Sequence, residues 1–306
     1  MKRRLAVLLM LIAPAAATAA GHRLLVADYS KHRIAIIGAD GKTEWEHKIG
    51  DLHDLHLLEN GNVLCQLSWT RLVEIDPRTD QVVWEYDAAT SNGNAGQKVE
   101  VHAFQRLPGG VTMIAESGPA RIIEVDRAGK LLHEVKLQVA RPHPHRDTRL
   151  VRKLENGNYL VCHEGEGAVR EYDPSGKVVW DYPVPLFGQA PRPGHGPEAF
   201  GNACFAAVRL PSGNTLISTG NGHSVIEVTP AKEVVWSLKQ DELPGIKLAW
   251  VTTLQVLPNG NIVLGNCHAG RAHPQVIEVT RDKRVVWTFR DFDRFGDATS
   301  NSQVLD

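Results

Sequence analysis

The chain of 306 residues carries 34 lysines and arginines against 35 aspartates and glutamates, so its formal net charge at pH 7 is −1. This balance excludes the strongly basic surface that binds nucleic acids or anionic membranes, and we expect no nucleic-acid partner. Four cysteines are too few for a disulfide-rich scaffold, whereas histidine, with 14 copies, is unusually frequent.

The first twenty residues predict a secretory signal peptide. A basic start (Met-Lys-Arg-Arg) precedes an apolar run at 5–14 and small residues up to Ala20. The run is too short for a membrane-spanning helix, and no later stretch is apolar enough to cross a bilayer. We expect cleavage after Ala19 or Ala20, and a periplasmic or secreted protein in which residues 21–306 form one domain without a membrane span.

A repeat follows along the whole chain. Glycine-centred turns recur between two apolar runs, and an aromatic residue follows the first four turns at a spacing of 23 residues. The turn glycines are Gly61, Gly110, Gly157, Gly213 and Gly260, and the later positions are Trp84, His133, Trp180 and Trp236, with Trp287 at 27 residues after an insertion. Each unit contains four short segments rich in Val, Ile, Leu and aromatic residues, which predicts four antiparallel strands. Four strands in a unit of about 40–55 residues are typical of a propeller blade.

The first unit ends at Trp45 and has no segment for its first strand, because counting back 23 residues reaches His22. Residues 300–306 align with the first-strand segments of the other units. We therefore predict an all-β, six-bladed β-propeller with four antiparallel strands per blade, whose first blade is closed by the C-terminal strand. The repeated tryptophans are expected to pack between blades, and His133 to take the same structural place.

The strand pattern also predicts one chemically active face. In an up-and-down blade, the start of the first strand and the end of the second lie on the same face, around the central channel. The positions eight residues before each turn glycine, with the C-terminal strand, are His53, His102, Arg149, Phe205, Thr252 and Ser300. We predict as catalytic residues His53, His102, His163 and His268. We predict as ligand-binding residues Arg149, Glu100, Glu116, Asn221, Asn266 and Ser300.

Several features of this face are left open. Many imidazoles at one channel mouth favour a bound ligand, anion or metal, but no metal-binding spacing occurs, and a metal held across blades stays one alternative. The long link from residue 183 onward, rich in Pro and Gly, is either a lid or partner surface, or an insertion without fixed structure. The cysteines are expected to be buried strand residues, with a Cys204–Cys267 bridge as the alternative.

The motif Leu-Pro-Asn-Gly-Asn at 257–261, followed by Val-Ile-Glu-Val-Thr at 276–280 and Val-Val-Trp at 285–287, resembles the repeats of pyrroloquinoline-quinone-type propellers. Over residues 22–306 the chain more closely resembles exported bacterial six-bladed propellers related to the arylsulfotransferases. That resemblance implies a central histidine that accepts a sulfuryl group from a phenolic sulfate ester. His53 and His102 match its nucleophile, His163 and His268 its assisting histidines, and Arg149 its anion-binding arginine.

The chain departs from that family at 299–302, which reads Thr-Ser-Asn-Ser where the family often has His-x-Asn-Ser. We also find no acidic cluster for the calcium ion that quinone-dependent dehydrogenases need. Three hypotheses remain: an exported propeller that binds a small ligand or a protein at its histidine-rich central face, an arylsulfotransferase-like enzyme with a histidine nucleophile, and a quinone- or metal-dependent oxidoreductase. The cofactor is left unassigned.

Overall fold

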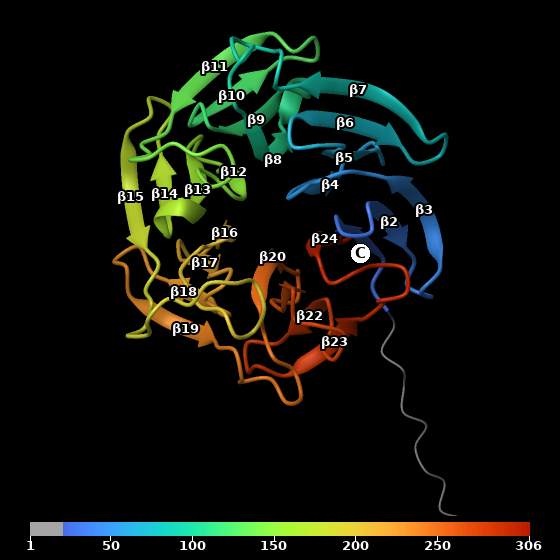
Figure 1. Cartoon of the computed structure of the whole chain (residues 1–306), viewed down its shortest axis with the longest axis vertical. Coiled ribbons are helices and arrows are strands. Elements are labelled where there is room, and N and C mark those ends of the chain that lie inside the picture. Colours follow the sequence, from blue (N-terminus) through green and yellow to red (C-terminus); the bar gives the residue numbers. More distant parts are fainter. Residues whose placement is uncertain (1–20) are drawn as a thin grey trace, which may run out of the picture.

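The computed structural model describes residues 21–306, so the predicted signal peptide lies outside the described residues. Six four-stranded sheets form a ring around a central axis (Figure 1). All strand pairs within the sheets are antiparallel, and the predicted six-bladed propeller is confirmed. In this part of the chain, no helix is long and apolar enough to cross a membrane.

The blades are numbered in chain order, and each is described from its inner to its outer strand. Blade 1 is β24 (Thr299–Val304), β1 (Leu24–Asp28), β2 (Arg33–Ile37) and β3 (Thr43–Lys48). Blade 2 is β4 (Leu55–Leu57), β5 (Val63–Gln66), β6 (Arg71–Asp76) and β7 (Gln81–Asp87). Blade 3 is β8 (Glu100–Arg106), β9 (Thr112–Ser117), β10 (Arg121–Val125) and β11 (Leu131–Lys136). Blade 4 is β12 (Val151–Lys153), β13 (Tyr159–His163), β14 (Ala168–Tyr172) and β15 (Val178–Pro183). Blade 5 is β16 (Ala206–Arg209), β17 (Thr215–Ser218), β18 (Val225–Val228) and β19 (Val234–Leu238), and blade 6 is β20 (Trp250–Val256), β21 (Ile262–Cys267), β22 (Val276–Val279) and β23 (Val285–Phe289). Short 3-10 turns follow β8 (Pro108–Gly110) and β13 (Glu164–Glu166).

The repeated glycine-centred turn also takes part in contacts between neighbouring blades. Gly61 has φ +82°, which favours glycine, and the following Asn62 donates from Nδ2 to Glu74 on β6 at 2.8 Å. Glu74 also accepts from Arg127 of blade 3, so one carboxylate ties a turn to the neighbouring blade. Equivalent glutamates recur in blades 4, 5 and 6, at Glu171, Glu227 and Glu278.

The outer-strand tryptophans hold neighbouring blades together, as the repeat predicted. Trp84 donates from Nε1 to the Arg127 carbonyl of the next blade at 2.9 Å, and Trp236 donates to the Arg281 carbonyl at 2.9 Å. His133 makes the corresponding contact, with its Nε2 3.0 Å from the Pro174 carbonyl. Its expected structural role is confirmed, because an imidazole N–H reaches the same kind of acceptor as an indole N–H.

The ring closes in blade 1. β24 pairs antiparallel with β1 over Leu24 to Asp28, which confirms the predicted closure by the C-terminal strand. His22 bridges to blade 6, where its Nε2 lies 2.7 Å from Glu278, and its Nδ1 lies 2.5 Å from Asp306. This closure brings segments from opposite ends of the sequence side by side (Figure 1).

Asp54, fully buried at the start of β4, joins the inner strands of four blades. Its carboxylate accepts two hydrogen bonds from Arg152 of blade 4, both at 2.8 Å. It also accepts from the Phe104 amide of blade 3 at 3.1 Å and from Asn301 of blade 1 at 3.3 Å. Charge-assisted, bidentate pairing of this kind is the strong class of hydrogen bond, so Asp54 fixes how these strands meet at the axis.

We predict that Asp54→Ala lowers the free energy of unfolding by about 3 kcal/mol, because it leaves the Arg152 guanidinium and the buried Phe104 amide without their acceptor. Urea denaturation followed by tryptophan fluorescence measures the loss. Asp40→Ala, which removes an exposed turn carboxylate paired with Lys42, is the matched control and should leave stability nearly unchanged. Equal effects of the two substitutions would contradict the role given to Asp54.

Stability should also fall in acid. Burial alone would raise the pKa of Asp54, but the Arg152 guanidinium lowers it to about 2. A lowered folded-state pKa means that the unfolded chain takes up the proton first, so this contribution, roughly 2 kcal/mol, is present above about pH 4 and is lost between about pH 4 and pH 2. Melting curves of the parent and of Asp54→Asn across this range should converge as the pH falls; a constant gap would contradict this account.

Candidate functional site

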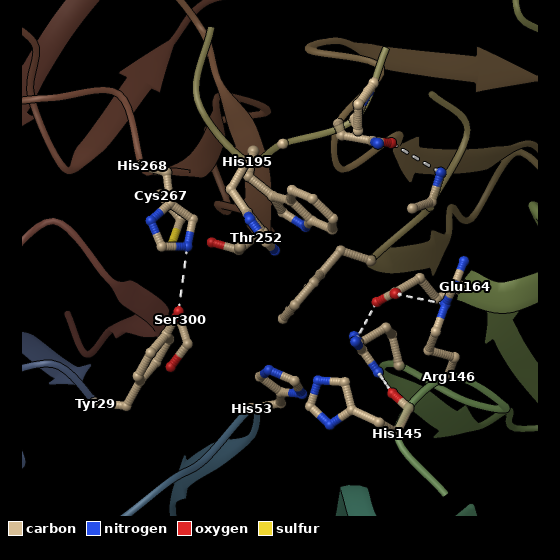
Figure 2. A pocket seen from close by; sticks show the side chains of 17 residues that line it. Tyr29, His53, His145, Arg146, Glu164, His195, Thr252, Cys267, His268 and Ser300 are labelled. Atoms are coloured by element: carbon tan, nitrogen blue, oxygen red, sulfur yellow. Dashed lines mark hydrogen bonds and ion pairs between the residues drawn. The ribbon is translucent and has the colours of Figure 1, made fainter. Parts of the chain in front are cut away.

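A cavity of about 500 Å³ opens at the channel mouth on the face where the inner strands begin (Figure 2). Five of the six positions singled out by the repeat line it: His53, Arg149, Phe205, Thr252 and Ser300. These positions occupy the same register in five different blades, so the blade repeat itself brings them together. The sixth, His102, is fully buried and contacts His53.

His53 and His102 form a hydrogen-bonded pair, with their Nδ1 atoms 2.9 Å apart. The other ring nitrogen of His102, Nε2, faces two acceptors, the Pro144 carbonyl at 3.2 Å and Glu100 Oε2 at 3.3 Å. Nε2 of His102 must therefore carry a proton, and a neutral His102 accepts at Nδ1 from the Nδ1–H of His53. This arrangement leaves Nε2 of His53 as an unprotonated lone pair at the cavity wall.

Both histidines are held neutral. Burial lowers the pKa of His102 to about 3, and the hydrogen bond to Glu100 offsets only part of this shift. Burial also holds the pKa of His53 well below its usual range, and the nearby Arg149 cation lowers it further. The pair therefore stays uncharged at neutral pH.

His145, from the link between β11 and β12, completes a cluster with this pair. Its Nδ1 lies 2.6 Å from Glu100 Oε2, and its ring centroid is 5.0 Å from that of His102. Burial alone would raise the pKa of Glu100, but its hydrogen bonds with His102 and His145 lower it to about 2. Trp69 packs against all three histidines, with ring centroids 4.7 to 5.2 Å apart.

A second wall of the cavity carries charge. The buried Arg149 donates to the Thr148 carbonyl at 3.1 Å and pairs with Glu164. Arg146 also approaches Glu164, with 3.5 Å between Nε and Oε1. Two guanidinium groups thus share one carboxylate, which leaves this wall with one net positive charge.

The third wall is aromatic and comes partly from the long link after β15. His195 of this link stacks on Trp250 with ring centroids 5.0 Å apart, and lies 5.3 Å from His268. Tyr29 contacts His268 across 3.2 Å between the hydroxyl and Nε2, and burial together with His195 lowers the pKa of His268. The predicted alternative of a link without fixed structure is wrong, because residues 183–204 have a defined path that brings His195 to the cavity (Figure 2).

Two buried hydroxyls at the cavity lack partners. Thr252 is 1% exposed and Ser300 2% exposed, and neither side-chain oxygen has a hydrogen-bond partner among residues 21–306. Leaving a buried hydroxyl unpaired costs free energy. Both residues, from blades 6 and 1, line the cavity, so rotation of either side chain would offer its hydroxyl to a molecule bound there.

The remaining predicted residues have other surroundings. Asn221 lines the cavity and accepts from the Ala203 amide at 3.0 Å, which holds the link in place. His163 is not among the lining residues, because Tyr172 and the Asp147 carbonyl occupy its two ring nitrogens at 2.9 and 2.8 Å. Glu116 pairs with Arg121 at 2.7 Å. Asn266 forms hydrogen bonds with three backbone groups of blade 6. Both Glu116 and Asn266 therefore make structural contacts away from the cavity.

The cysteines are buried, as expected from the sequence. All four, which lie within residues 21–306, are buried and free. The alternative Cys204–Cys267 bridge is not formed, because Cys204 lies in the interface between blades 4 and 5 beside Cys162, while Cys267 faces the cavity. Burial raises the pKa of the Cys267 thiol well above its usual range, so it is a poor nucleophile.

Three residues of the site were not predicted from the sequence: Tyr29, Trp69 and Trp250. The strand pattern does place the link residues His145 and His195 on this face, but it gives them no role. A signal was present for the tryptophans. Five of the seven occupy the outer-strand position of the repeat, and the two that do not, Trp69 and Trp250, are the ones at the histidine clusters. A departure from a repeat is thus a guide to residues that serve something other than packing.

Comparison with known proteins supports the fold. The structure is similar to a crystal structure of a protein of unknown function from Bacteroides caccae, at 24% identity and a TM-score of 0.75, over 92% of this chain and 98% of that chain. It is also similar to a streptogramin B lyase structure at 10% identity and a TM-score of 0.58, over 90% of this chain and 85% of that chain. A catalytically inactive virginiamycin B lyase from Staphylococcus aureus, solved with quinupristin, gives 12% identity and a TM-score of 0.58, over 90% of this chain and 87% of that chain. At these identities the likeness shows the fold alone.

A search of curated proteins finds no match. A family model described as outer membrane protein assembly factor BamB, PQQ_2, matches residues 30–289, which confirms the pyrroloquinoline-quinone-type repeat. Because this match spans most of the chain, the protein belongs to the PQQ_2, BamB-like repeat family.

Proposed function

We propose that the protein binds a small organic molecule in the central cavity, outside the cytoplasm as the N-terminal apolar run suggests. The observation that carries this proposal is the pair of buried hydroxyls of Thr252 and Ser300, which line one cavity and have no partner among the described residues. The cavity volume of about 500 Å³ falls within the range of small-molecule sites. A ligand that accepts hydrogen bonds from both hydroxyls gives each of them the partner that it lacks.

The walls indicate the class of ligand. Phe205 and the stacked His195 and Trp250 favour a flat, aromatic group. Arg146 and Arg149, with one carboxylate between them, favour an anionic group at the other end. We therefore propose an aromatic molecule with an acidic or ester-linked anionic substituent, for which p-nitrophenyl sulfate is a convenient probe.

We expect p-nitrophenyl sulfate to bind in calorimetry and to raise the melting temperature. Ser300→Ala and Thr252→Val should each weaken binding by about tenfold or less, because each removes one hydrogen bond to the ligand. Thr112→Val is the matched control, since Thr112 also has a buried hydroxyl without a partner in the described chain but lies away from the cavity. If no binding is detected, or if all three variants bind like the parent, the proposed ligand class is wrong.

A second candidate function, group transfer by an arylsulfotransferase-like enzyme, is favoured by the state of His53. Its Nε2 is unprotonated, its Nδ1 donates to His102, and its ring is neutral. A histidine nucleophile needs such a lone pair beside groups that stabilise the transferred anion. His53 Nε2 would attack the sulfur of a phenolic sulfate, the S–O bond to the phenol would break, and a second phenol would then accept the sulfuryl group.

For this chemistry we expect p-nitrophenol release from p-nitrophenyl sulfate that depends on added phenol. His53→Ala should abolish turnover, with a loss of about a thousandfold or more, because it removes the nucleophile. His47→Ala, on β3 away from the cavity, serves as the control and should keep parental activity. Binding without turnover in the parent would exclude transfer and leave the binding function intact.

A further inference from the structure

The cluster beside His53 has the composition of a metal site. Glu100 and His102 come from β8 of blade 3, and His145 from the link to blade 4. Glu100 Oε2 lies 2.6 Å from His145 Nδ1 and 3.3 Å from His102 Nε2, and the three donor atoms lie within 4.8 Å of one another. We infer that these three side chains bind a divalent transition-metal ion, with Zn²⁺ as the best fit.

The donor set decides the kind of ion. Two imidazoles and one carboxylate suit zinc and other late transition metals, whereas Ca²⁺ and Mg²⁺ prefer oxygen ligands. Ligands about 2.1 Å from a tetrahedral ion are separated by about 3.4 Å. The His102–Glu100 distance of 3.3 Å already fits, and His145 needs to retreat by less than about 1 Å, because the proton that joins it to Glu100 is replaced by the ion.

Neighbouring side chains hold a ligand of this site in place, and the site is open to solvent. His102 is held by the hydrogen bond to His53 and packed against Trp69, which fixes its ring as a metal ligand requires. Glu100 and His145 have side chains that are 23% and 40% exposed, so an ion can arrive from the solvent. Three protein ligands leave a fourth position for water or another molecule, as in catalytic zinc sites.

The positive charge beside the site is partly offset. Arg149 and Arg146 oppose a cation, but Glu164 pairs with both of them. Glu100 supplies a carboxylate oxygen to the ion directly. A divalent ion is thus bound directly by the Glu100 carboxylate, and Glu164 reduces the charge of the wall beyond it from two positive charges to one.

Metal binding has a consequence for His53. An ion on Nε2 of His102 leaves the proton of that ring on Nδ1, from which it is donated to His53 Nδ1. His53 then keeps its own proton on Nε2, so the lone pair at the cavity is lost. Zinc would therefore inhibit group transfer; this consequence rests on the proposed transfer function, whereas binding of the ion does not.

The test is a calorimetric titration of chelator-treated protein, purified without a histidine tag, with ZnCl₂. We expect one ion per chain, and we expect Glu100→Gln and His145→Gln each to weaken binding by at least about tenfold, since even residues that only support a ligand cost that much. The control is His47→Gln. His47 lies on β3, with its Nδ1 2.9 Å from Asp80 Oδ1, and its replacement should leave the affinity for zinc at the parental value.

Cobalt provides a second readout that does not depend on activity. Co²⁺ bound by two imidazoles and a carboxylate should give visible absorption bands in the parent that disappear in His145→Gln, while circular dichroism stays parental because His145 is partly exposed. Absence of stoichiometric zinc binding, or parental binding by both ligand variants, would overturn the inference. The titration contains no aromatic ligand and the p-nitrophenyl sulfate assay contains no zinc, so either proposal can fail alone.

Discussion

The structure depends on the carboxylate of Asp54 at the axis of the ring. It accepts hydrogen bonds from blades 1, 3 and 4 while it belongs to blade 2. Asn301, one of its donors, in turn accepts from Thr253 of blade 6 at 3.1 Å, and Ser218 of blade 5 donates to the Thr252 carbonyl at 3.2 Å. Polar contacts near the axis therefore involve all six blades, through the inner strands of five and through β17, the second strand, of blade 5. Backbone and side-chain polar groups are buried there and need partners.

This constraint also positions the candidate site. His53 directly precedes Asp54, and the amides of both residues donate to the Gln66 side chain at 3.0 and 3.3 Å. With its backbone fixed in this way, the His53 ring can meet His102 across the blade boundary. The same residues that close the ring thus determine which nitrogen of His53 faces the cavity, and they link fold stability to the chemistry of the site.

The fold was predictable because its signal is repeated. The spacing between turn glycines and outer-strand aromatics appears in several copies, and the C-terminal segment that completes blade 1 matches the same pattern.

The site was predictable only in part. The register of the first strands identified His53, Arg149 and Ser300, but the strand pattern also favoured His163 and Glu116, whose partners Tyr172 and Arg121 hold them elsewhere. Contacts across blades and through links had no such signal, since nothing in the local pattern pairs Glu100 with His145, which lie 45 residues apart. The path of the link after β15 likewise depends on contacts with other parts of the fold, and local sequence preferences do not determine it.

The closed ring holds His53 neutral, with its unprotonated Nε2 at the cavity. Ring-nitrogen NMR of ¹⁵N-histidine-labelled, zinc-free protein at neutral pH, with the signals assigned through His53→Gln and His102→Gln, tests this most directly. We expect His53 to be protonated at Nδ1 and unprotonated at Nε2, and His102 to have the opposite tautomer. A proton on Nε2 of His53, or a charged His53 ring, would contradict it.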